Sequence, residues 1–219
     1  MVLVVFALPE EARIFQRRLR RRRKAEVFFE GMMDGGTKVG ICFVGIRATA
    51  IADLETAIQR LAPTLVISSG FAGATRSLLE PGDFLLASNY TTAHAEISVG
   101  SLVDATGPFC SVEQISGPAE KKSLGAFGVA VDMESKAIAA VCDRRQIPLI
   151  TARMISDGRD ENIPPVFIGE KLRSAKDAMA AGKFAFRVLR LTHLLADRLT
   201  RLIKFVTKAD DGNHLFGIT

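Results

Sequence analysis

The sequence predicts an α/β protein built around one hydrophobic core. Patterns typical of strands and of helices alternate along the chain, which is the arrangement of layered α/β folds. The chain has 219 residues, 48% of them hydrophobic, so it can bury one sizeable core. Charged residues make up 24% and no stretch has low complexity, which excludes a disordered chain. We therefore expect a single domain over residues 1–219.

The first half of the chain is punctuated by turn residues that separate its elements. Pro9 directly follows the opening apolar run and suits the first turn of a helix. Gly35 and Gly36 supply a turn between two strands, and Pro63 ends the next helix. The expected elements are a strand at 2–8, a helix at 10–22, strands at 26–33 and 37–46, a helix at 48–61 and a strand at 64–68.

The second half begins with a loop of small residues and ends in a long helical pattern. We expect one or two helices over about 171–206, because that segment is longer than most globular helices. The elements expected before it are a loop at 69–73, a strand at 84–89, short strands and turns over 90–116, a helix at 118–126, a strand at 128–133, a helix at 135–145 and a strand at 148–155.

The net charge of +5 comes largely from two basic segments, at 17–24 and 183–208. The first, RRLRRRRK, lacks the interleaved aromatics of a single-strand-binding groove, and the chain carries no zinc-finger or RNA-recognition motif. We expect no nucleic-acid partner and interpret 17–24 as a solvated helix end. Contact with a polyanion or a membrane surface is the alternative, and the basic, amphipathic C-terminal helix suits a membrane surface as well.

The cysteines and the first apolar run favour a cytoplasmic protein. Cys42, Cys110 and Cys142 are odd in number and far apart, which argues against both a disulfide framework and a zinc site. The first apolar run is too short for a membrane span and has no basic segment before it, so it is interpreted as a strand. No residue pattern calls for a metal or a cofactor.

Acidic residues are predicted to gather at one edge of the sheet. Glu134 and Asp157 each follow a strand, and a right-handed crossover would make those strands parallel, with their carboxyl ends together. Glu10 and Glu11 follow the first strand, and the small-residue loop at 69–73 follows another. Open α/β sheets bind ligands at that edge. Acidic residues in the first turn of a helix also interact favourably with the helix dipole. This structural role remains an alternative for each of these acids.

Four stretches carry a resemblance to a known family. VDMESKAIAAVCDRRQIPLITARMISDG resembles the hallmark region of the purine nucleoside phosphorylase and uridine phosphorylase superfamily, most closely the nucleosidases that hydrolyse methylthioadenosine and S-adenosylhomocysteine. VVFALPEEARIF is similar to that family's N-terminus, and LVISSGFAGA followed by PGDFLLAS to its glycine loop and next strand. The resemblance implies a three-layer α-β-α fold with a central mixed twisted sheet, a purine nucleoside substrate and a homo-oligomer, with a dimer favoured.

The resemblance also implies roles for individual residues. Glu134 matches the glutamate that binds the ribose hydroxyls, and Met133 the methionine under the sugar. Asp157 matches the aspartate that donates a proton toward N7 of the purine. Glu11 matches the carboxylate that deprotonates the attacking water. These roles suit the chemistry, since cleavage of an N-glycosidic bond builds positive charge on the ribose and the departing base needs a proton.

Further residues are placed around this expected site. Ser156 and Arg153 are expected to hold Asp157, while Asp132 either supports the site or caps the helix that begins beside it. The segment over 90–126 is shorter than in typical methylthioadenosine nucleosidases. The other expected substrate-binding residues are Ser69, Gly70 and Phe71 of the glycine loop, Arg47, and Gln114 and Ile115 where the family often has an aromatic residue.

The function predicted is hydrolysis of a purine nucleoside, most simply a 5′-modified adenosine. Phosphorolysis is the first alternative, because a phosphate would need cations at the glycine loop and Arg47 and Arg76 are available. The stretch GPAEKKSLGAFGVAVDMES also resembles the hopanoid-associated branch of the superfamily, which implies an adenosyl-lipid nucleosidase as a second alternative. A scaffold or polyanion-binding protein without turnover is the third.

Overall fold

The computed structural model describes residues 1–93, 99–114, 117–164, 166, 171 and 174–210. Among these, the strands are β1 (Val2–Phe6), β2 (Arg20–Lys24), β3 (Phe28–Met32), β4 (Lys38–Phe43), β5 (Leu65–Ala74), β6 (Phe84–Ala87), β7 (Ala105–Gly107), β8 (Phe109–Ser111), β9 (Ala130–Asp132) and β10 (Leu149–Asp157). The helices are α1 (Pro9–Arg18), α2 (Ile51–Leu61), α4 (Pro118–Leu124), α5 (Ser135–Arg145) and α6 (Ala175–Asp210), with 3-10 turns at Ile46–Ala48, Ser88–Tyr90 and Gly100–Leu102.

The strands form one mixed sheet in the order β2-β3-β4-β1-β5-β10-β6-β7, and β9 pairs with both β5 and β8. The central strands β4, β1, β5 and β10 are parallel to one another. Antiparallel pairs occur on both sides of this centre, β3 with β4 and β6 with β10. The mixed sheet flanked by helices confirms the predicted three-layer α-β-α fold.

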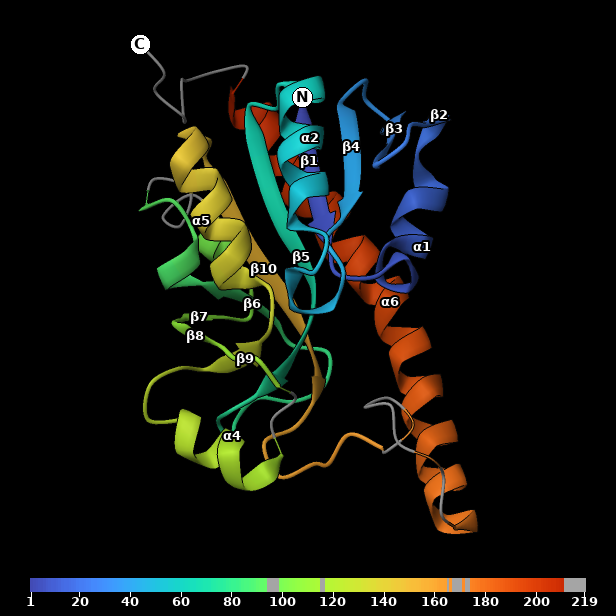
Figure 1. Cartoon of the computed structure of the whole chain (residues 1–219), viewed down its shortest axis with the longest axis vertical. Coiled ribbons are helices and arrows are strands. Elements are labelled where there is room, and N and C mark those ends of the chain that lie inside the picture. The colour runs from blue at the N-terminus through green and yellow to red at the C-terminus, as the bar shows by residue number, and fades with distance from the viewer. Residues whose placement is uncertain (94–98, 115–116, 165, 167–170, 172–173, 211–219) are drawn as a thin grey trace.

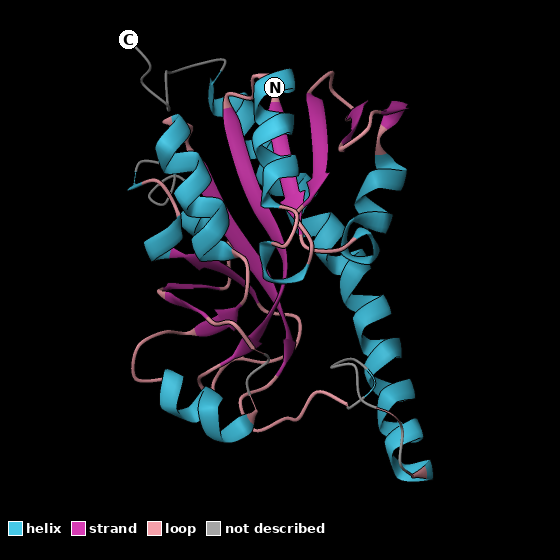
Figure 2. Cartoon of the chain, viewed as in Figure 1, coloured by secondary structure: helices cyan, strands magenta, loops and turns pink. Residues whose placement is uncertain are grey.

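Helices cover both faces of the sheet, α2 and α5 on one face and α1 and α6 on the other (Figures 1 and 2). The alternating directions of the side chains of β1 show why both faces are covered. Val2, Val4 and Phe6 pack in the cluster formed with α1 and α6, while Leu3 and Val5 pack in the cluster formed with α2 and α5. Because successive side chains of a strand point to opposite faces, a strand that is apolar throughout must be covered on both sides.

The last helix, α6, is a single helix of 36 residues. Its buried side chains recur every three or four residues, as a helix packed along one face requires; they include Leu191, Leu195, Leu199, Leu202 and Val206. Its N-terminal turns project beyond α1 in Figure 1, and its C-terminal half runs behind the sheet. Within the described ranges, no helix is both long and apolar enough to cross a lipid bilayer.

Three local expectations were wrong. The basic run does not extend the first helix: α1 ends at Arg18, and Arg20–Lys24 form the exposed edge strand β2. The small residues at 69–73 are no loop, because β5 continues to Ala74 and has buried or half-buried side chains throughout. The strand before Glu134 is not parallel to β10, since β9 pairs antiparallel with β5 and β10 pairs parallel with it. All three corrections concern the sheet, whose pairing is not local in sequence.

Candidate functional site

A cavity of about 140 Å³ opens where β5, β9 and β10 end. It is lined by the second half of β5, by the end of β9, by α4 and by the bulged end of β10; the lining residues are Phe71, Ala72, Gly73, Val112, Gln114, Lys121, Val131, Asp132, Met133, Glu134, Ser156, Asp157 and Ile163. Of the acids that the sequence places at the sheet edge, Glu134 and Asp157 are in this set, and Glu10 and Glu11 are not. The predicted meeting of Glu134 and Asp157 is therefore found in the structure.

The direction of β9 brings Glu134 to the cavity. Val131 pairs with Gly73 in antiparallel register, so the chain that leaves β9 is carried back along β5 toward Phe71. Met133 and Glu134 follow at once and line the cavity. The parallel crossover that we expected would have delivered Glu134 from the opposite direction, to the same edge.

Glu134 is buried, with 7% of its surface exposed, and is the residue that precedes α5. Its carboxylate accepts a hydrogen bond from the backbone N–H of Arg47, at 2.9 Å. Arg47 adopts a left-handed backbone conformation, with φ of 60°, which is costly for a residue other than glycine and turns its N–H toward the acid. Burial raises the pKa of Glu134, and the nearby Arg153 guanidinium and the Arg47 N–H oppose that rise.

Glu11, in the first turn of α1, is held by three backbone N–H groups. Those of Ala7 and Leu8 donate to one carboxylate oxygen, each at 3.1 Å, and that of Phe71 in β5 donates to the other, also at 3.1 Å. Burial still raises the pKa of Glu11 to about 7, because desolvation outweighs these hydrogen bonds. Gly70 makes the approach of Glu11 to β5 feasible: a Cβ at this position would lie 2.8 Å from the carboxylate, and its φ is 141°.

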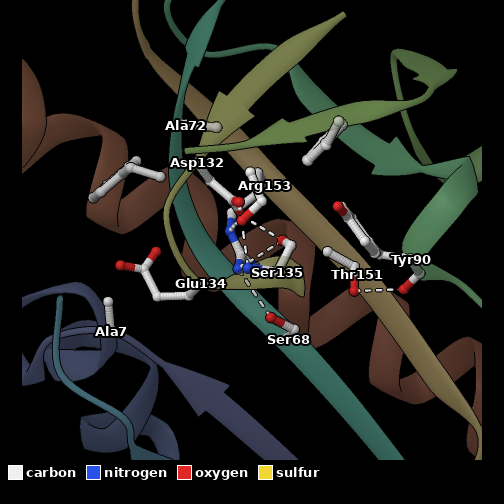
Figure 3. A network of polar contacts seen from close by, with 12 residues as sticks. Ala7, Ser68, Ala72, Tyr90, Asp132, Glu134, Ser135, Thr151 and Arg153 are labelled. Atoms are coloured by element: carbon white, nitrogen blue, oxygen red, sulfur yellow. Dashed lines mark hydrogen bonds and ion pairs between the residues drawn. The ribbon is translucent and has the colours of Figure 1, made fainter. Parts of the chain in front are cut away.

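Asp132 and Arg153 form a buried ion pair, with Arg153 Nε 3.1 Å from the Asp132 carboxylate. Figure 3 shows the Arg153 guanidinium among Asp132, Ser135 and Ser68, and its Nη2 donates to Ser68 Oγ at 2.9 Å. Asp132 also accepts hydrogen bonds from the backbone N–H and the hydroxyl of Ser135, the first residue of α5. Asp132 therefore both supports the site and caps this helix. Arg153, which we expected to hold Asp157, is paired with Asp132 instead.

Asp157 is almost fully buried, with 1% of its surface exposed. One of its carboxylate oxygens accepts a hydrogen bond from Ser156 Oγ at 2.6 Å, the contact that we expected. The other forms a buried ion pair with Lys121 of α4. The pairing of β10 with β5 is irregular between Ile155 and Asp157, and such a bulge re-aims the side chains at a strand end.

Lys121 was missed by sequence analysis. The one signal available was its place in the short helix at 118–126, where it shares a face with Pro118 and Leu124. Its neighbour Lys122 gave the same charge signal but is exposed, so the sequence could not tell the two apart.

The remaining predicted site residues lie at different depths. Met133 and Phe71 are half-buried and Gln114 is exposed, and all three line the cavity. The Ser69 hydroxyl is buried without a hydrogen-bond partner in the part of the chain that the structure describes, and so is Nη1 of Arg153. Ile115 lies outside the described residues. In the same described part, no three His, Cys, Asp or Glu side chains are grouped so as to hold a metal ion.

Comparisons with known proteins identify relatives of this chain. A family model described as the phosphorylase superfamily matches residues 90–189. The chain is 25% identical to a 5′-methylthioadenosine/S-adenosylhomocysteine nucleosidase of Anoxybacillus flavithermus, over 74% of this chain and 88% of that protein. A Haemophilus influenzae protein with the same name is 27% identical, over 72% of this chain and 86% of its own length. The family model and these relatives show that the chain is similar to the phosphorylase superfamily.

Solved structures show the same fold for this chain. The futalosine hydrolase of Helicobacter pylori superposes with a TM-score of 0.72 at 18% identity, over 93% of this chain and 97% of that one. A Borrelia burgdorferi protein, described as a putative 5′-methylthioadenosine/S-adenosylhomocysteine nucleosidase bound to adenine, gives a TM-score of 0.74 at 19% identity, over 93% and 99% of the two chains.

The candidate site has three acids in three different settings. Glu11 has a raised pKa near neutrality and is held by backbone N–H groups. Glu134 lines the cavity next to a methionine, and Asp157 lines it with a lysine as its ion-pair partner. Two carboxyl groups in different environments are what acid and base roles in one reaction require.

Proposed function

We propose that the chain is a purine nucleosidase, which uses water to cleave the bond between the base and C1′ of the ribose, and that residues 1–219 form one such domain. The observation that carries the proposal is the convergence of Glu134, Asp157 and Met133 on one cavity, with Glu11 held against the adjoining strand β5. The named relatives, nucleosidases and a futalosine hydrolase, support hydrolysis of a nucleoside.

In the proposed reaction, Glu134 accepts hydrogen bonds from the ribose hydroxyls and stabilises the positive charge that develops on the sugar. Met133 packs beneath the ring. Glu11, when ionised, takes a proton from water as the water oxygen bonds to C1′. Asp157 faces the base, where a proton must arrive as the bond to C1′ breaks.

Water is favoured over phosphate as the nucleophile. A phosphate would need free cations facing the Gly70 segment of β5. The side chains of Arg47 and Arg76 are exposed, and the buried Arg153 forms an ion pair with Asp132 through its Nε. The substrate class proposed is a 5′-modified adenosine, by analogy with the names of the relatives.

The decisive experiment is an assay of base release. The protein is incubated with methylthioadenosine, S-adenosylhomocysteine, adenosine, inosine and futalosine, with and without phosphate, and free base and sugar are measured. We expect base and free sugar without phosphate. A requirement for phosphate would replace hydrolysis by phosphorolysis, and full activity of a Glu134→Gln variant would refute the site.

We further propose a cytoplasmic homodimer. Cys42, Cys110 and Cys142 are all free thiols, which suits a reducing compartment. The projecting turns of α6 expose Met179 and Phe186, 59% and 64% accessible, which a second copy or a membrane surface would cover. Light scattering of the protein and of a Phe186→Glu variant distinguishes these two coverings: a monomeric wild-type protein would refute the dimer.

A further inference from the structure

Lys121 is one of the most deeply buried side chains, with 1% of its surface exposed. Burial of an ammonium group is costly unless every N–H finds an acceptor. Lys121 Nζ meets that condition with three acceptors: the Asp157 carboxylate and, each at 2.9 Å, the carbonyl oxygens of Gly158 and Glu161. Lys121 also lines the cavity. Because its ammonium group has three acceptors there, it is an integral part of the site.

Neighbouring residues on two sides keep Lys121 and Asp157 in contact. Gly73 of β5 lies directly behind them: a Cβ at this position would be 3.0 Å from the Asp157 carboxylate and 3.4 Å from Lys121 Cε. From the other side, Ser156 donates to the second carboxylate oxygen. The pair is therefore fixed between α4, β5 and β10.

The other charged groups near the pair have partners of their own. Glu161 is bound through both carboxylate oxygens by Arg187 of α6, at 2.6 and 2.7 Å. Across the cavity, Asp132 is paired with Arg153, and Glu134 accepts the Arg47 N–H. Within the described residues, the contacts of these groups leave Lys121 as the cation that neutralises Asp157.

We propose that the acid of the reaction is the Lys121–Asp157 pair, in which Lys121 is a positioning residue that supplies the proton Asp157 delivers. This rests on the proposed nucleosidase function. As the bond between C1′ and N9 breaks, its electron pair passes to the base, and the Asp157 carboxylate receives a proton from the Lys121 ammonium and passes it to N7. Water adds hydroxide to C1′ and gives its proton to Glu11. Solvent then returns a proton to the Lys121 amine and removes one from Glu11, so the sum is addition of one water.

Substitutions at position 121 separate this role from a structural one. In Lys121→Met, Asp157 must take its proton from solvent, so base release should fall increasingly as pH rises above neutrality, while the wild type keeps its rate. Lys121→Arg retains the charge, but a guanidinium does not give up its proton, so adenine release should fall by about 100-fold or more. Lys122→Met removes an exposed lysine from the same helix and should leave the rate and the pH profile unchanged.

A substrate that needs no acid gives the second readout. The 4-nitrophenolate of 4-nitrophenyl β-D-riboside leaves without a proton, so Lys121→Arg should cleave it at close to the wild-type rate while failing on the purine nucleoside. Equal purine cleavage by wild type and Lys121→Arg, with the same pH profile, would overturn the proposal. If Lys121→Met fails to fold, as judged by thermal melting, Lys121→Arg decides alone. A wild type that releases no base would instead refute the proposed function.

Discussion

The ionisation of Glu11 should appear in the pH dependence of stability. Burial raises the pKa of Glu11 from 4.5 to about 7 in the folded protein. Between these two pH values, the folded state keeps a proton that the unfolded chain has released. The contribution of this proton to the free energy of unfolding is fully present below about pH 4.5 and is lost as pH rises through about 7. The difference between 4.5 and about 7 corresponds to about 3 kcal/mol, at about 1.4 kcal/mol per pH unit.

The measurement is urea unfolding of wild type and Glu11→Gln at pH values from 4.5 to 8. The substitution also alters the hydrogen bonds from Ala7, Leu8 and Phe71, so its effect at any single pH is a mixture. The change of the stability difference with pH isolates the ionisation: relative to wild type, the variant should gain about 3 kcal/mol over this range. Glu10→Gln, at the exposed neighbour, should follow wild type. Parallel curves for wild type and Glu11→Gln would refute the assignment of the raised pKa.

Three further predictions concern the surroundings of the site and the core. Gly70→Ala should lower kcat/KM for base release by about 100-fold, because the methyl group displaces the Glu11 carboxylate; an unchanged rate would show that Glu11 needs no contact with β5. Asp132→Ala should cost about 3–5 kcal/mol in denaturant unfolding, because Arg153 keeps a buried charge without a partner; a cost below about 1 kcal/mol would contradict the ion pair. Leu199→Ala, at a fully buried position of α6, should cost about 2–5 kcal/mol and lower Tm accordingly; an unchanged Tm would argue against the packing of α6 on the sheet.

Local patterns were enough to predict the elements with strong signals. Residues 135–145 form a helix with the predicted bounds, because an apolar face and a preceding acid mark both its register and its start. β1 was equally clear, since an apolar run that long can only be a strand covered on both faces. The loop predicted at 69–73 was wrong because glycine content indicates loops in general, while here Gly70 serves the close approach of Glu11 within a strand.

The meeting of two acids at one cavity was predicted better than the sheet that brings them together. Glu134 and Asp157 line one cavity, yet the argument from parallel strands was wrong, since β9 is antiparallel to β5. Pairing direction depends on contacts between distant segments, which a local pattern does not contain. The same limit explains why the ion-pair partners of Lys121 and Arg153 were not predicted. A sequence shows that a cation is present, but its partner follows only from the packing of α4 and β10.

The edge strand β2 has a consequence for how copies of the chain can meet. Its five residues, Arg20–Lys24, are all basic and all exposed. An open strand edge is a template for joining sheets of two molecules, and cations on the edge oppose it. Two copies joined at β2 would bring ten cations together, five from each; in each copy, Arg20 and Arg23 have acidic partners in Asp34 and Glu30. Self-association through sheet extension is therefore blocked on this side during folding and afterwards, and assembly of copies is directed to other surfaces.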